Sequence, residues 1–253
     1  MTSNRRRLLP NGLGNTAILV ALLLLCVHTL SVESVAGCPA GQYSTAVSTT
    51  TCYNCAAGSY SSATGLISAC KNLCQSGRYS TAAGAISSAS CAACVAGSYS
   101  SASGLPNPCS SLCASGQFAT VQAATSSSIC VSCVAGSYSS ASGLPSACSL
   151  CPPGLYSTSL AATSSATCLS CAAGSYSSAS GAPSACTALC APGRYSTALR
   201  ATSSSVCSSC AAGSYSSASG LASACVLLCL PGYYSTALAV TSSANCLQCV
   251  SGS

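Results

Sequence analysis

The chain has 253 residues and a net charge of +6, with 24 cysteines but only seven Lys or Arg residues, one acidic residue and one histidine. General acid–base catalysis normally uses His, Asp, Glu, Lys, Tyr or Cys. The first three are nearly absent and the tyrosines recur periodically, as structural residues do, so this composition argues against an enzyme. Nucleic-acid binding needs a clustered basic patch, and here the basic residues are few and scattered. The composition therefore argues against a nucleic-acid partner as well.

The start of the chain predicts a secretory signal peptide with a short helix. Arginines at positions 5–7 precede an apolar run from Thr16 to Val32, and small residues follow it. A basic start, an apolar centre and small residues at the end are typical of a signal peptide. We therefore expect cleavage after Ala36, which removes residues 1–36. An uncleaved anchor is the alternative, but the run is shorter than the about 20 residues that span a bilayer. The prediction is a secreted or cell-surface protein.

Beyond this segment the chain has no Asp, Glu or His and keeps four basic residues, so its net charge falls to +4. A serine-rich chain without a histidine or carboxylate has no base that could activate a nucleophile. We therefore expect no catalytic residue, no cofactor-binding residue and no cofactor. We interpret the four basic residues as isolated, solvated charges: Lys71, Arg78, Arg194 and Arg200.

Residues 37–253 form a tandem cysteine-rich repeat of about 39 residues. C-x2-C pairs recur along the chain, and their first members are 39, 39, 38, 39 and 39 residues apart. A second set of cysteine pairs divides each repeat into two half-repeats. The first kind, such as Cys171–Cys186, spaces its cysteines 15 apart, and the second, such as Cys190–Cys207, spaces them 17 apart. With a shortened opening copy, Cys38–Cys52, the chain holds eleven closed half-repeats and a truncated twelfth.

Every closed half-repeat carries an aromatic ring five residues after its first cysteine and two after a glycine. The glycine supplies either an unusual backbone conformation or a close approach. We predict a short strand at the ring, a Ser/Thr-rich turn and a second short strand, with the ring packed against a disulfide. No helical period of 3.6 occurs in the repeats. The predicted fold is a small disulfide-rich, irregular β unit in an elongated tandem array. The structural rings are Tyr43, Tyr60, Tyr79, Tyr99, Phe118, Tyr138, Tyr156, Tyr176, Tyr195, Tyr215 and Tyr234.

The simplest disulfide pattern closes each half-repeat on itself. Such small units cannot offset the entropy of ordering their backbone without cross-links, and the secretory route favours disulfides. Spacing alone leaves other connectivities open. We call this pattern of local disulfides the ladder. It leaves Cys249 unpaired, as expected if the chain stops inside its twelfth half-repeat. Cys249 would then be free to form an intermolecular disulfide. The predicted pairs are Cys38 with Cys52, Cys55 with Cys70, Cys74 with Cys91, Cys94 with Cys109, Cys113 with Cys130, Cys133 with Cys148, Cys151 with Cys168, Cys171 with Cys186, Cys190 with Cys207, Cys210 with Cys225, and Cys229 with Cys246.

Segments such as "CPPGLYSTSLAATSSATCLSC" (151–171) and "CPAGQYSTAVSTTTCYNC" (38–55) resemble the ephrin-receptor-like cysteine-rich repeat. That repeat is related to the cysteine-rich modules of TNF receptors and growth-factor receptors. The resemblance extends over almost all of Cys38–Cys249 and implies an extracellular, elongated, disulfide-bonded rod. This chain differs from receptor modules in lacking acidic residues and in the near identity of its copies.

The repeat is compatible with three functional classes: a metal-binding protein, a structural rod and a receptor ectodomain. C-x2-C is a zinc-site spacing, but thiols oxidise in the secretory route, so we expect no metal ligands. Near-identical copies favour a structural or adhesive rod of a cell surface or matrix, since a spacer needs length and stiffness rather than a unique face. The alternative is the ligand-binding ectodomain of a surface receptor. In either case the partner would be an extracellular protein or glycan, with no membrane span in the mature chain.

Overall fold

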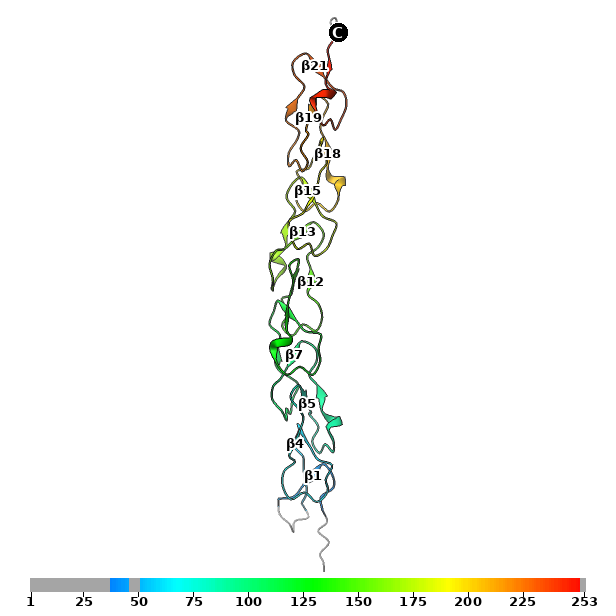
Figure 1. Ribbon diagram of the computed structural model, residues 1–253. Coiled ribbons are helices and arrows are strands. Elements are labelled where there is room, and N and C mark those ends of the chain that lie inside the picture. Colours follow the sequence, from blue (N-terminus) through cyan, green and yellow to red (C-terminus); the bar gives the residue numbers. More distant parts are fainter. Residues whose placement is uncertain (1–36, 46–50, 251–253) are drawn as a thin grey trace, which may run out of the picture.

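The protein is a long, thin rod in which the chain advances from one end to the other (Figure 1). A computed structural model describes residues 37–45 and 51–250. The predicted signal peptide, its helix and its cleavage site lie outside these residues. The described residues form 22 strands of two residues and five 3₁₀ helices of three residues, and everything between them is turn or irregular. The fold is therefore a small disulfide-rich array of tandem repeats, as predicted.

Each half-repeat contributes two strands, and from η1 onward every second half-repeat adds a 3₁₀ helix. They are β1 (Gln42–Tyr43), β2 (Tyr53–Asn54), β3 (Ser59–Tyr60), β4 (Asn72–Leu73), β5 (Arg78–Tyr79), η1 (Ser88–Ser90), β6 (Ala92–Ala93), β7 (Ser98–Tyr99), β8 (Ser111–Leu112), β9 (Gln117–Phe118), η2 (Ser127–Ile129), β10 (Val131–Ser132), β11 (Ser137–Tyr138), β12 (Ser149–Leu150), β13 (Leu155–Tyr156), η3 (Ser165–Thr167), β14 (Leu169–Ser170), β15 (Ser175–Tyr176), β16 (Ala188–Leu189), β17 (Arg194–Tyr195), η4 (Ser204–Val206), β18 (Ser208–Ser209), β19 (Ser214–Tyr215), β20 (Leu227–Leu228), β21 (Tyr233–Tyr234), η5 (Ser243–Asn245) and β22 (Leu247–Gln248).

Each half-repeat contributes one antiparallel hairpin, but its second strand lies elsewhere than predicted. In the first hairpin Tyr43 of β1 pairs with Tyr53 of β2, and β2 is the two-residue link between Cys52 and Cys55. The same holds along the rod: the second strand is the link between cysteines, not the segment after the Ser/Thr turn. The disulfide explains this, because it brings the end of the half-repeat, and hence the link, alongside the ring strand.

The glycine two residues before each ring has an unusual backbone conformation and, in most half-repeats, a close contact with another half-repeat. The eleven glycines at this position have φ between 75° and 83°. The Gln42 amide donates to the Pro39 carbonyl at 3.1 Å, which with the positive φ of Gly41 is the arrangement of a type II turn. A Cβ on Gly41 would also lie 2.9 Å from the carbonyl carbon of Gly84 and closer still to its oxygen. Both the backbone conformation and the close approach therefore require glycine.

Among the described residues, the 3₁₀ helices all lie in half-repeats of the second kind, whose cysteines are 17 rather than 15 residues apart. In η1 the Cys91 amide donates to the Ser88 carbonyl at 3.0 Å, and the Ser87 side chain accepts from the amide of Ala89. The tight turn takes up the additional residues while bringing the closing cysteine back to its partner. Sequence periodicity did not predict these helices, because a single turn is too short to show a period.

The core of the rod is a column of disulfides. Ten of the eleven opening cysteines are at most 2% exposed, among them Cys55, Cys94, Cys133 and Cys171, each 0% exposed. Small residues complete the core, and the largest apolar side chain in it is Leu155. The cysteine Cα atoms in each bridge are 5.4–5.7 Å apart, within the usual range for a disulfide. The pairs are those of the predicted ladder: 38–52, 55–70, 74–91, 94–109, 113–130, 133–148, 151–168, 171–186, 190–207, 210–225 and 229–246.

Neighbouring half-repeats are joined mainly through their backbones. Each ring residue except Tyr234 forms a parallel bridge with a residue of the next half-repeat, as Tyr60 does with Ala85. Beside that bridge the Ser61 amide donates to Ala85 at 3.1 Å, and the Gly84 amide donates to Cys55 at 2.8 Å. The glycine contact already described reaches one half-repeat further. Stacking therefore couples each unit to the next two, and apart from the required glycine this coupling depends little on side-chain identity.

Candidate functional site

The residue just before the ring distinguishes the two kinds of half-repeat. In the first kind it is always a buried serine that closes its own turn, as when the Ser59 hydroxyl donates to the Ala56 carbonyl at 2.8 Å. In the second kind the residue varies, and its burial varies with it, from exposed arginines to a buried leucine. The position is occupied by Arg78, Gln117, Leu155, Arg194 and Tyr233 in the five copies that follow the shortened opening one. Variation is thus concentrated at one register position of the second kind.

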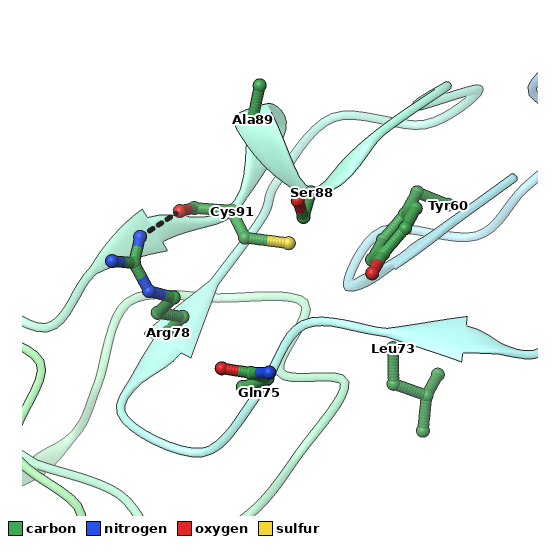
Figure 2. Close-up of a pocket in the computed structure, with 7 residues that line it drawn as sticks. All are labelled: Tyr60, Leu73, Gln75, Arg78, Ser88, Ala89 and Cys91. Carbon is green, nitrogen blue, oxygen red and sulfur yellow. Dashed lines mark hydrogen bonds between the residues drawn. The ribbon is translucent and has the colours of Figure 1, made fainter. Parts of the chain in front are cut away.

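Arg78 lies at the edge of an open hollow of about 400 Å³. Its Nη1 atom donates to the Cys91 carbonyl at 3.0 Å, a contact drawn in Figure 2. One wall of the hollow is formed by residues of η1 and the opposite wall by residues near β4, while the Cys91 sulfur points toward the ring of Tyr60 (Figure 2). The lining residues are Tyr60, Leu73, Gln75, Arg78, Ser88, Ala89 and Cys91.

Arg194 occupies an equivalent hollow of about 450 Å³ further along the rod. Its Nη1 atom donates to the Cys207 carbonyl, again at 3.0 Å. The lining repeats the first hollow position by position, with serines of η4 where η1 stood. Its members are Tyr176, Leu189, Ala191, Arg194, Ser204, Ser205 and Cys207. Two copies with the same contact show that the arginine geometry is set by its register in the repeat.

The arginines cover the closing cysteines of their own half-repeats. Cys91 and Cys207 are each 4% exposed, whereas Cys130 and Cys168, whose half-repeats carry glutamine or leucine at this position, are only half-buried. Each arginine nevertheless remains exposed. The hydrogen bond to the cysteine carbonyl uses one of the five N–H donors of a guanidinium, and residues 37–253 contain no carboxylate side chain that could neutralise it. The positive charge is therefore available at the surface.

The other residues singled out from the sequence are the aromatic rings of the repeat, two isolated basic residues and the unpaired cysteine. The rings are half-buried between successive half-repeats, and only Tyr234 of the last described one is exposed, at 46%. Lys71 and Arg200 are exposed outside the two hollows, in agreement with solvated charges. Cys249 is a free, exposed thiol. Within residues 37–45 and 51–250 no three His, Cys, Asp or Glu side chains are grouped as a metal site would require.

Sequence reasoning treated Arg78 and Arg194 as two of four scattered charges, and it missed their common setting. The signal was present in the repeated "GRYSTA", which occurs at 77–82 and 193–198. Each arginine directly precedes the ring, and this position is exposed in some half-repeats of the second kind but in none of the first. The distinction depends on the hairpin register, which the sequence pattern had placed differently.

Comparison with known proteins adds no relative: no protein-family model and no curated protein matches the sequence. The part of the chain that the structure describes also contains no helix long and apolar enough to cross a bilayer. The fold and its surface therefore carry the functional interpretation.

Proposed function

We propose that the protein is a non-enzymatic, secreted structural or adhesive rod of a cell surface or matrix, built from ephrin-receptor-like cysteine-rich repeats. The observation that carries this proposal is the backbone stacking of one half-repeat on the next, as in the pairing of Tyr60 with Ala85. Contacts of this kind are the same in every copy, so length and stiffness grow with copy number. The many disulfides support an extracellular location, because such bonds persist in oxidising compartments.

The ectodomain of a ligand-binding surface receptor is the second candidate function. The variable position just before the ring of the second-kind half-repeats favours it, because the residue there differs between copies while the stacking contacts do not. Near identity everywhere else favours the rod, since most of the surface of one repeat is repeated on the next. The rod therefore remains the principal proposal.

Small-angle X-ray scattering of the oxidised chain tests the rod directly. A compact domain of about 220 residues has a radius of gyration of roughly 17 Å, and we expect a value well above this. Deleting one complete repeat, residues 171–209, should shorten the maximum dimension by a fixed increment, and deleting two should double it. A radius of gyration near that of a compact domain, or no shortening with copy number, would refute the proposal.

Covalent pairing through Cys249 is a further element of the proposal, because this thiol is exposed and lies outside the ladder. The expected product is a disulfide-linked dimer of rods. Non-reducing electrophoresis of the secreted chain should show a dimer that disappears on reduction and in Cys249→Ser. A purely monomeric oxidised chain would remove this element and leave the rod itself unaffected.

A further inference from the structure

We propose that the two arginine hollows form a bivalent binding surface for an acidic polysaccharide, with one acidic sugar unit held at Arg78 and another at Arg194. This inference goes beyond the rod function, which requires no ligand at all. It rests on three features: the charge of the hollows, the residues that line them and their placement on the rod.

The charge of the hollows selects an anionic group. The planar fork of an arginine matches a carboxylate or sulfate, to which it can donate two parallel hydrogen bonds. Arg78 is already held in place by its bond to the Cys91 carbonyl, so less side-chain freedom is lost when a ligand binds. With no carboxylate side chain in residues 37–253, the anion has no internal competitor for the guanidinium.

The lining of the hollows suits a polyhydroxylated ring. Each hollow combines an aromatic ring, Tyr60 or Tyr176, with serine, one in the first hollow and two in the second. Aromatic rings pack against the C–H face of a sugar, while hydroxyl and amide groups both donate and accept hydrogen bonds. In the first hollow Gln75 adds an amide beside the arginine. A charged sugar uses all three kinds of contact at once, which a bare inorganic anion does not.

The placement of the hollows favours a polymer. In Figure 1 η1 (residues 88–90) and η4 (residues 204–206), which wall the two hollows, project from the same edge of the rod, while η2 and η3 project from the opposite edge. The copies on that opposite edge carry the uncharged Gln117 and the buried Leu155 where the other two carry arginine. The cationic hollows are thus the two that face one side. A chain long enough to reach both gains affinity by avidity, which a short fragment cannot.

The test is binding of the full secreted chain to immobilised heparin, which carries sulfate and carboxylate groups, and to polygalacturonate, which carries carboxylate alone, with neutral dextran as reference. We expect saturable binding to at least one acidic polymer and none to dextran. Binding to polygalacturonate would show that a carboxylate is sufficient. Arg78→Gln with Arg194→Gln should weaken binding at least about tenfold, the loss of charge-assisted contacts at both hollows. Glutamine is tolerated at this register, because the molecule folds with Gln117 there.

A matched control carries the same loss of charge. Lys71→Gln with Arg200→Gln removes two exposed cations outside the hollows, and binding should change by less than about twofold, as for screened surface charges. Arg78→Lys with Arg194→Lys keeps the charge but not the fork and should give an intermediate loss. A tetrasaccharide of the preferred polymer should bind weakly, because a tetrasaccharide occupies one hollow at a time. For the same reason, Arg194→Gln should change the affinity for the tetrasaccharide by no more than about twofold.

Three results would overturn the inference: no binding to either acidic polymer, unchanged affinity in the double arginine-to-glutamine variant, or an equal loss in the matched control. None of them bears on the rod, since the radius of gyration is measured without a ligand.

Discussion

The two kinds of half-repeat make the same backbone turn with different residues. In the first kind the turn residue with positive φ is always glycine, such as Gly143 at 68°; in the second kind it is glycine only at Gly84 and otherwise alanine or arginine, as at Ala161 with φ of 50°. In both kinds the backbone amide of this turn residue donates to the carbonyl oxygen of the opening cysteine of the preceding half-repeat. The donor–acceptor distance is 2.8 Å for both Gly143 and Ala161. Stacking therefore imposes the turn even where the side chain opposes it.

The largest expected effect comes from the glycine that packs against such a turn two half-repeats away. In Gly136→Ala the new Cβ would lie 2.9 Å from the Ala182 carbonyl oxygen and closer still to the Gly181 carbonyl. A left-handed alanine costs roughly 1–2 kcal/mol and overpacking roughly 1–3 kcal/mol more, so unfolding should become easier by about 4 kcal/mol. Guanidinium unfolding of the oxidised chain, followed by tyrosine fluorescence, measures this.

The chain offers a matched control for that substitution. Gly213 has the same register and a φ of 79°, but a Cβ there would meet nothing within 4 Å. Gly213→Ala should therefore show only the conformational cost, roughly 1–2 kcal/mol. Equal destabilisation by the two substitutions would mean that stacking on the second neighbour does not exist.

The next largest effect is expected from removing a disulfide, and it can be compared between the two kinds of half-repeat. Removing the bridge of the first-kind unit with Cys133→Ser and Cys148→Ser should cost about 3 kcal/mol. Removing that of the second-kind unit with Cys151→Ser and Cys168→Ser should cost nearly the same, because the longer loop adds only about 0.1 kcal/mol in chain entropy. The same unfolding experiment measures both. A difference of several kcal/mol would show that the 3₁₀ turn contributes stability of its own.

A smaller and opposite effect is expected at the second-kind turn. Ala161→Gly relieves the left-handed alanine and should raise stability by about 1 kcal/mol. Ala162→Gly, one residue along at a 5% exposed position, should instead destabilise, because it removes a buried methyl group. A destabilised Ala161→Gly would contradict the idea that stacking holds this turn against its own preference.

The smallest effect concerns the cover over the cysteines. Arg78→Gln should make the 74–91 bridge reduce a few-fold faster and so bring it closer to the 113–130 bridge, where Gln117 already stands. Disulfides react according to access by the attacking thiolate, and Cys91 loses its shield in the variant. Alkylation under mild reductant, read by mass spectrometry, gives the rates. Unchanged rates would show that the arginine does not protect the bridge.

Much of this architecture could be predicted because the repeat itself is so regular. The cysteine spacing predicted a ladder of local bridges, and the glycine and ring positions predicted one hairpin in each half-repeat. The strand position was wrong, because Cys52 and Cys55 look like a linker until a disulfide brings that linker beside β1. The hollows could not be predicted for a related reason: whether Arg78 faces outward depends on which residues pair in three dimensions.

The central claim is that each half-repeat closes on itself and stacks on the next two, and disulfide mapping tests it most directly. Partial reduction of the oxidised chain, alkylation and mass spectrometry would identify which cysteines are released together. We expect eleven pairs, each within one half-repeat, and Cys249 in none of them. Release of cysteines from different half-repeats as a pair, such as Cys55 with Cys91, would contradict this expectation.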